Sequence, residues 1–271
     1  MEETPMKKIF ASVLVLCLIF ALASTAFADD GFVFKQGFDL DYPPYSYLQD
    51  DGSVGGFDVE LCQAVCEYLG WGYEPVPFNW DVKDAELNSG SCDCIWSGFT
   101  VEGREDDYVW SIPYSNNKQM ILVADDSGIT TLADLAGKIV GVQTATSAYD
   151  LLQEDQAELA ATFQELVVYE TYTIAYNDLK AGAIDAIAID ITAGSFLKAD
   201  DTGFSFLEET LGDESYAVGF RLGDEELCEQ INTALLALAE NGKMAEIASN
   251  EDYAEIIDML TLIDVPADTA A

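Results

Sequence analysis

The feature that most constrains the fold is the alternation of strand-like and helix-like segments from about residue 32 onward. Residues 184–189, with the apolar run 186–189, are typical of a buried strand, whereas apolar residues recur at helical spacing in 57–69. Alternating β and α segments predict an α/β fold with largely parallel sheets. The segments form two sets without a flexible linker, and strands near 119–124 and 214–220 join the sets. We therefore expect two lobes connected by a double crossover.

These crossovers predict the domain organisation. Lobe 1 should comprise residues 31–117 and 215–271, and lobe 2 should comprise residues 118–214. Residues 1–28 are expected to form a cleaved signal peptide that precedes lobe 1.

The N-terminal segment has the three parts of a signal peptide. The basic pair Lys7-Lys8 precedes an apolar run over 9–23, and Ala26-Phe27-Ala28 supplies a small-x-small cleavage pattern. The run is shorter than the roughly 18–20 residues that a membrane span needs, which disfavours a membrane anchor. We expect an exported protein, in the periplasm or on the outer cell surface. The sequence leaves open whether translation starts at Met1 or Met6 and whether a lipid anchor is present.

Composition excludes several function classes. The chain has 50 Asp and Glu against 11 Lys and Arg, with a formal net charge of −39. Nucleic acids need a basic footprint, so we expect no nucleic-acid partner. The chain has no histidine, which removes histidine-based catalysis and histidine-ligated zinc. We expect no metal and no cofactor.

Cysteine usage leaves the thiol chemistry open. Cys62 and Cys66 share a predicted helix face, and Cys92 and Cys94 share a strand face. A bridge between the two pairs is compatible with export. Their apolar surroundings favour buried free thiols, and pairing cannot be deduced from sequence.

Polar side chains follow the predicted strands, where open α/β sheets bind ligands. After the strand at 92–96, Ser97 and Thr100 offer hydroxyls, and Gly98 lets the backbone approach closely. Arg104 follows with a planar guanidinium that suits a carboxylate. The alternative for Arg104 is a surface ion pair with its acidic neighbours.

Two further candidate features lie in the second set of segments. Thr146 and Ser147 stand between a strand and a helix, where backbone N–H groups and hydroxyls can hold an anion. Asp190 ends an apolar strand and suits an ammonium group. The alternative for all three residues is the capping of the next helix or turn.

An aromatic pair completes the candidate site. Tyr42 and Trp80, with Asp39 nearby, could form walls around a ligand side chain, although aromatic residues are more often part of a core. An anion clamp, a cation partner and aromatic walls together match a zwitterionic amino acid.

The same residues carry a family resemblance. Matching motifs run in order over about residues 33–250: Asp41-Tyr42-Pro43-Pro44-Tyr45, Gly56-Phe57-Asp58-Val59-Glu60-Leu61, Trp80-Asp81, Ser97-Gly98-Phe99-Thr100, Arg104, Trp110-Ser111-Ile112-Pro113-Tyr114, Asp134-Leu135-Ala136-Gly137-Lys138, Val140-Gly141-Val142-Gln143, and Ile184-Asp185-Ala186 to Asp190. In these motifs the chain resembles the family 3 extracellular solute-binding proteins, the amino-acid receptors of ABC importers. The resemblance implies the bilobed, type II periplasmic-binding-protein-like fold, with two α/β lobes and a two-strand hinge.

The resemblance also implies roles for the candidate residues. In lobe 1, the ligand α-carboxylate would be held by Ser97, the Gly98 backbone, Thr100 and Arg104. Lobe 2 would add Thr146 and Ser147 to this clamp, and Asp190 would take the α-ammonium. Tyr42 and Trp80 would enclose the side chain, and Asp39 would meet its polar end.

Two departures from the family pattern concern the clamp. Arg104 follows Thr100 by four residues instead of the usual five, which indicates a one-residue loop deletion. Ala145 replaces a frequent glycine in the lobe-2 loop.

The implied function is a receptor that binds a free amino acid and delivers it to the membrane subunits of an ABC permease, as a monomer and not as an enzyme. A polar or basic ligand is favoured, because the site motifs contain no second arginine or lysine for an acidic one. The alternatives are a free-standing amino-acid sensor and a cyclohexadienyl (prephenate or arogenate) dehydratase-like enzyme on the same fold.

Overall fold

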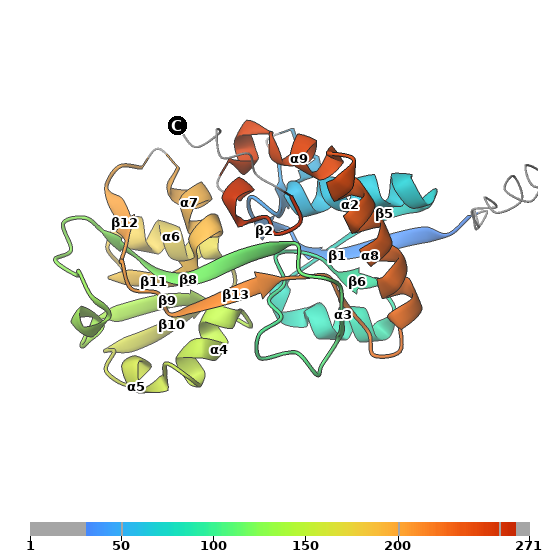
Figure 1. The fold of residues 1–271 in the computed structure, drawn as a ribbon. Coiled ribbons are helices and arrows are strands. Elements are labelled where there is room, and N and C mark those ends of the chain that lie inside the picture. Colours follow the sequence, from blue (N-terminus) through green and yellow to red (C-terminus); the bar gives the residue numbers. More distant parts are fainter. Residues whose placement is uncertain (1–30, 50, 200, 255, 264–271) are drawn as a thin grey trace, which may run out of the picture.

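The computed structural model describes residues 31–49, 51–199, 201–254 and 256–263, which form two α/β lobes (Figure 1). The predicted signal peptide lies outside the described residues. Within those ranges, the helices are too short or too polar to cross a membrane.

A five-stranded sheet forms the centre of the first lobe. Its strand order is β5 (Gly72–Phe78), β1 (Val33–Asp39), β6 (Cys94–Ile95), β14 (Gly219–Phe220) and β7 (Val109–Trp110). Strand β1 runs parallel to β5 and β6, as the sequence predicts, and β14 is antiparallel to its neighbours. A small antiparallel sheet lies beside it and contains β2 (Asp41–Tyr42), β3 (Ser46–Leu48) and β4 (Val54–Gly55).

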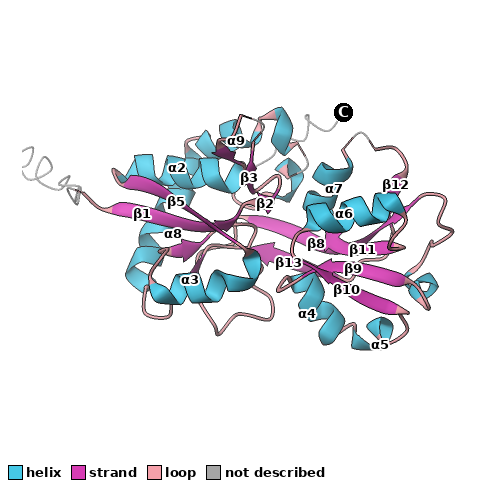
Figure 2. Ribbon diagram, turned by 180° about the vertical axis from the view of Figure 1, so that it is seen from behind, coloured by secondary structure: helices cyan, strands magenta, loops and turns pink. Residues whose placement is uncertain are grey.

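Helices cover both faces of this sheet. Helices α2, α8 and α9 pack against one another on one face, and helix α3 packs against β1 and β6 on the other face (Figure 2). The elements are α2 (Phe57–Leu69), α8 (Glu225–Glu240), α9 (Lys243–Ala248) and α3 (Lys83–Ser89). Helix α2 ends at Gly70, which takes the left-handed conformation (φ 73°) that the sequence signal predicts.

The second lobe is built around a six-stranded sheet. Its strand order is β10 (Glu165–Tyr169), β9 (Ile139–Gln143), β11 (Ala186–Asp190), β8 (Ser115–Ala124) and β12 (Phe204–Phe206), and β13 (Gly212–Tyr216) also pairs with β8. Strand β11 is buried along its whole length between β9 and β8, which explains its apolar sequence.

Helices lie on both faces of the second sheet as well, with α6 and α7 on one side and α4 and α5 on the other (Figure 2). Their bounds are α4 (Ser147–Gln153), α5 (Ala157–Ala160), α6 (Tyr172–Ala181) and α7 (Ile191–Lys198). Short 3-10 turns occupy Trp80–Val82, Leu132–Leu135, Glu251–Tyr253 and Ile257–Met259.

Two antiparallel strands, β8 and β13, connect the lobes (Figure 1). Their register places Asn117 opposite Glu214 and Lys118 opposite Asp213. The predicted boundaries between lobes 1 and 2, at residues 117/118 and 214/215, therefore lie next to each other across the two strands. The boundaries themselves stay a prediction. The second crossover strand ends at Tyr216, and Gly219–Phe220 forms the separate strand β14 in the lobe-1 sheet.

The cysteines of the described chain are buried free thiols, as the apolar contexts favour: Cys62, Cys66, Cys92, Cys94 and Cys228. Burial raises the pKa of the Cys92 thiol to about 12 and that of Cys228 to about 11, because the thiolate loses its hydration.

We expect these thiols not to react with Ellman's reagent in the folded protein, because the cysteine thiolate must attack the disulfide bond of the reagent and both exposure and thiolate content are low. Complete reaction of the same five thiols should follow unfolding in guanidinium chloride. The absorbance of the released nitrothiobenzoate measures both states. Rapid labelling of two or more thiols in native buffer would contradict this burial.

Candidate functional site

A cavity between the lobes contains all ten residues that the sequence singled out. It is lined by Asp39, Tyr42, Trp80, Ser97, Gly98, Thr100, Arg104, Gln143, Thr146, Ser147 and Asp190. Gln143 is the one lining residue that the prediction omitted. The residues meet because β1, β6, β9 and β11 all direct their carboxyl ends toward the other lobe.

The lobes touch each other around this cavity. The Trp80 indole N–H donates to the Ala145 carbonyl at 2.9 Å, and Gln143 Nε2 donates to Asp39 Oδ2 at 2.9 Å. The cavity has a volume of about 20 Å³, roughly the room that one water molecule needs. An amino acid must therefore widen it, which requires the lobes to move apart.

Arg104 reaches the cavity despite the shortened loop. A turn closed by the Arg104 N–H and the Val101 carbonyl (2.9 Å) brings its side chain over the Phe99 ring. The guanidinium Nη2 lies 2.5 Å from Asp150 Oδ2 on helix α4 of the other lobe. Arg104 thus forms an ion pair, but with a partner across the cleft and not with its acidic sequence neighbours.

The Ser97 hydroxyl belongs to a network inside lobe 1. Ser46 Oγ donates to the Asp39 carbonyl at 2.7 Å, which uses its single hydrogen. In the 2.7 Å contact between Ser46 Oγ and Ser97 Oγ, Ser97 must therefore be the donor. Ser97 Oγ also accepts the Asp39 N–H at 3.2 Å. In this arrangement its hydrogen is directed at Ser46 and not at the cavity, and its oxygen holds the Asp39 backbone.

The Gly98 N–H is also committed. It donates to Asp58 Oδ2 at 2.7 Å, and burial raises the pKa of the Asp58 carboxyl to about 7. Gly98 has φ +54°, and a Cβ at this position would lie 2.5 Å from the Tyr42 ring. Glycine is thus required for the close approach of Tyr42, and the Gly98 backbone group left for a ligand is its carbonyl.

The loop before α4 adopts the conformation that a glycine would favour. Ala145 has φ +56°, a left-handed conformation, although it replaces the frequent glycine. Thr146 caps α4: its Oγ1 accepts the Tyr149 N–H at 3.3 Å and donates to the Gln143 carbonyl at 2.8 Å. The alternative interpretation of Thr146 as a helix cap is therefore the one observed.

The remaining two hydroxyls bind one carboxylate of the protein itself. Thr100 Oγ1 and Ser147 Oγ, one from each lobe, both donate to Glu214 Oε2, at 3.0 and 2.5 Å. Because each hydroxyl has one hydrogen, neither can donate to a ligand carboxylate in this arrangement. Of the predicted carboxylate clamp, Arg104 is the member with side-chain donors left over in this arrangement, and the roles of the other members stay a prediction.

Asp190 faces the cavity and does not cap the helix that follows it. It stands at the N-cap position of α7 without a side-chain capping bond. Its Oδ1 accepts hydrogen bonds from the Tyr216 hydroxyl (2.5 Å), Asn117 Nδ2 (2.9 Å) and Gln119 Nε2 (2.5 Å). Tyr216 spends its hydrogen on Asp190, so Tyr42 is the donor in the 2.8 Å contact between their hydroxyls.

Acceptors dominate the polar surface of the cavity. Gln143 is 1% exposed, and its Oε1 is buried without a hydrogen-bond partner in the described structure. Burial raises the pKa of Asp39 to about 6, although hydrogen bonds from the Asp41 N–H and Gln143 oppose this shift. A nearby positive charge would lower the pKa of Asp39 again. The site therefore favours a ligand rich in N–H donors and positive charge.

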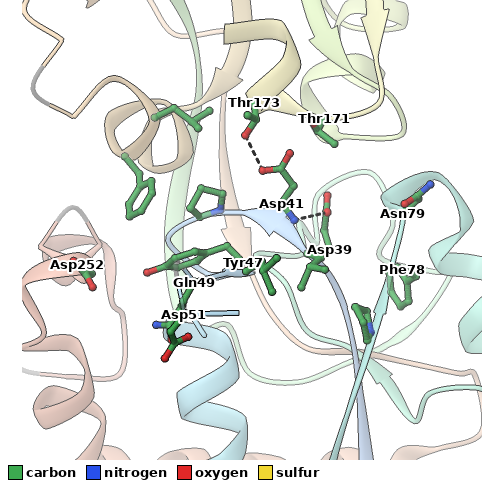
Figure 3. Close-up of a pocket in the computed structure, with 16 residues that line it drawn as sticks. Asp39, Asp41, Tyr47, Gln49, Asp51, Phe78, Asn79, Thr171, Thr173 and Asp252 are labelled. Carbon is green, nitrogen blue, oxygen red and sulfur yellow. Dashed lines mark hydrogen bonds between the residues drawn. The ribbon is translucent and has the colours of Figure 1, made fainter. Parts of the chain in front are cut away.

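An acidic outer cleft lies next to the cavity. It has a volume of about 1000 Å³, and the described residues that line it include four carboxylates, Asp39, Asp41, Asp51 and Asp252, and no lysine or arginine. Asp39 lines both spaces, and Asp41 lies between it and Thr173 of the other lobe (Figure 3). Such a cleft concentrates cations at its mouth.

Sequence reasoning missed the polar residues of the hinge. Ser115, Asn117 and Gln119 alternate along β8 and are all buried, as are Glu214 and Tyr216 on β13. A period of two in polar residues, followed by the apolar run 120–123, is the signal that could have revealed a polar buried face. The role of Asp150 could not be predicted, because nothing in the sequence distinguishes it from other acidic residues on a helix surface.

Two α/β lobes, joined by two strands and closed over a charged cavity, define a hinged ligand-binding protein. The chain belongs to family 3 of the bacterial extracellular solute-binding proteins, whose family profile matches residues 34–250. This family assignment agrees with the resemblance predicted from the sequence motifs. It places the chain among binding receptors and not among enzymes.

Individual relatives bind amino acids. The chain is 27% identical to the L-cystine-binding protein of Escherichia coli (87% of this chain, 91% of that one). It is 29% identical to the arginine-binding extracellular protein of Bacillus subtilis (89% and 96%). A solved ABC uptake transporter substrate-binding protein from Streptococcus pneumoniae with bound histidine superposes with a TM-score of 0.77 at 33% identity (82% and 94%).

Proposed function

We propose that the protein is an exported receptor that binds a free, preferably basic amino acid between its lobes and delivers it to an ABC permease. The observation that carries this proposal is the charge arrangement of the cavity. Two carboxylates, Asp39 and Asp190, line it together with one guanidinium, Arg104, which already has the acidic partner Asp150. An amino acid with a carboxylate, an α-ammonium and a cationic side chain complements this arrangement.

Each charged residue has a proposed partner on the ligand. Arg104 has five N–H donors, and Asp150 uses only part of them, so others are left for the α-carboxylate. Asp190, with the Gly98 carbonyl, takes the α-ammonium. Asp39 and Gln143 Oε1 meet the donors at the far end of the side chain, which lies between Tyr42 and Trp80.

The ligand class is supported by the relatives, which bind arginine, histidine and cystine. Cleavage of a signal peptide after Ala28, docking on permease membrane subunits and a monomeric state are part of the same proposal. The sensor and dehydratase alternatives gain no support from the comparisons, because the family and the relatives named above are solute-binding proteins.

Thermal-shift screening should identify the ligand. We expect L-arginine, L-lysine or L-histidine to raise the melting temperature, and L-aspartate and L-glutamate to have no effect. At 100 times Kd the stabilisation is about 2.7 kcal/mol, which corresponds to roughly 5–10 °C for a protein of this size. No shift with any of the twenty amino acids or L-cystine would contradict the proposed function.

A further inference from the structure

Glu214 lies where both lobes and both hinge strands meet. It is 6% exposed, on β13, and the β8 residue opposite it is Asn117. Its donors come from lobe 1 (Thr100), from lobe 2 (Ser147) and from the hinge, where Asn117 Nδ2 and Gln119 Nε2 approach Oε1 at 2.5 and 2.8 Å. One carboxylate therefore holds four side chains of the closed arrangement.

Glu214 is also the close neighbour of Asp190. The two carboxylates share the donors Asn117 and Gln119. Burial, and secondly the charge of Asp190, raise the pKa of Glu214 to about 7. Among the described residues, no lysine or arginine is hydrogen-bonded to either carboxylate. The pair therefore carries excess negative charge beside the cavity.

Glu214 also lines a second cavity, the hinge-side cavity, which has a volume of about 410 Å³. Its lining includes Glu214 and Asn117, and its other charged residues are Glu102, Lys118 and Asp213. Lys118 is paired with Asp213 at 3.9 Å, and both side chains are at least half exposed. Tyr216 also faces the carboxylate pair, and burial raises its pKa, so it stays neutral near pH 7. Glu214 thus lies between the hydrogen-bond network of the ligand cavity and a second, hinge-side space.

We infer, on the basis of the proposed function, that Glu214 is a positioning residue that ties Thr100 and Ser147 together and gives up a proton when an ammonium group binds at Asp190. The O–H bond of the protonated Glu214 carboxyl breaks, its electron pair stays on the carboxylate, and the proton leaves to water through the hinge-side cavity. Glu214 thereby makes the site selective for cationic head groups.

The sign of the linkage follows from the charges. A bound ammonium cancels the charge of Asp190, which is one cause of the raised pKa, so the pKa of Glu214 falls on binding. The complex then carries fewer protons than the free protein, and affinity must rise with pH up to about 7 and level off above it. Asp39, whose pKa is about 6, acts in the same direction at lower pH.

Isothermal titration with L-arginine at pH 7.0, in buffers of different ionisation enthalpy, measures the released protons. We expect about half a proton from Glu214, because its pKa in the free protein is about 7. The Glu214→Gln variant should release only about 0.1 proton, the fraction that Asp39 carries at pH 7.0 with a pKa of about 6, and its affinity should lose the dependence on pH between 6.5 and 8. If arginine does not bind, L-histidine or L-cystine replaces it.

Two controls separate the possible causes. Asp213→Asn removes a carboxylate from the adjacent position of β13 and should leave proton release unchanged. Asp39→Asn should keep most of the release at pH 7, and it tests the inference even if Glu214→Gln does not fold. Amino-acid binding without proton release, or with equal release in Glu214→Gln, would overturn this inference alone. Binding of no amino acid would overturn the proposed function and the inference with it.

Discussion

Replacing Asp190 with asparagine should weaken amino-acid binding by about 100- to 1,000-fold. The substitution keeps an acceptor for Tyr216 and the hinge amides but leaves the ligand ammonium without its charge partner in a buried site. Loss of one member of a buried, hydrogen-bonded charge pair costs about 2–5 kcal/mol. Calorimetric titration of the preferred amino acid from the thermal-shift screen measures the change.

The Asp190→Asn variant should bind more weakly but should not be less stable than the unmodified protein. Asp190 raises the pKa of Glu214 by its charge, which reflects repulsion between the two carboxylates. Asp190→Asn removes that repulsion, so we expect the melting temperature without amino acid to stay the same or rise. Asp155→Asn, which removes an exposed carboxylate of the same lobe, is the matched control for net charge. Near-wild-type affinity in Asp190→Asn would reject the proposed ammonium site.

Arg104→Ala should cost about 10- to 150-fold in affinity. Hydrogen bonds to charged groups contribute about 1.5–3 kcal/mol, and the hydroxyls that might have compensated are committed to Glu214. The affinity of Arg104→Lys should lie between those of Arg104→Ala and the unmodified protein, because an ammonium keeps the charge but lacks the planar arrangement of N–H donors. Arg221→Lys, at the other arginine of the chain, should leave affinity unchanged.

A second variant separates the two roles of Arg104. Asp150→Asn removes only the ion pair across the cleft, whose carboxylate side chain is 49% exposed. Such pairs contribute about 0–1 kcal/mol, so its affinity should fall less than about fivefold. If Asp150→Asn were as damaging as Arg104→Ala, the main role of Arg104 would be to join the lobes and not to bind the ligand.

The sequence predicted the fold, and it predicted residues that the structure brings together around one cavity, whereas their role in binding stays a prediction. In parallel sheets the carboxyl ends of strands meet at one edge, so Asp39, Ser97 and Asp190 could be placed together without coordinates. Arg104 lines the cavity although it follows Thr100 by one residue fewer than in the family pattern.

The allocation of hydrogen bonds could not be predicted. Whether a hydroxyl donates to a ligand depends on which acceptors distant strands bring near it. Ser97 is committed to Ser46, and Thr100 and Ser147 are committed to Glu214, which is more than 60 residues away from either. Glu214 itself stands in an ordinary acidic segment, and only the pairing of β13 with β8 reveals its burial.

The burial of the cysteines has a practical consequence for studying how the lobes move. Since the five thiols of the described residues are shielded, one cysteine added to the exposed rim of each lobe of the chain without its predicted signal peptide could carry a fluorescent dye with little background labelling. Energy transfer between the dyes would then follow opening and closing in single molecules. The same protein would serve as an optical sensor for its amino acid.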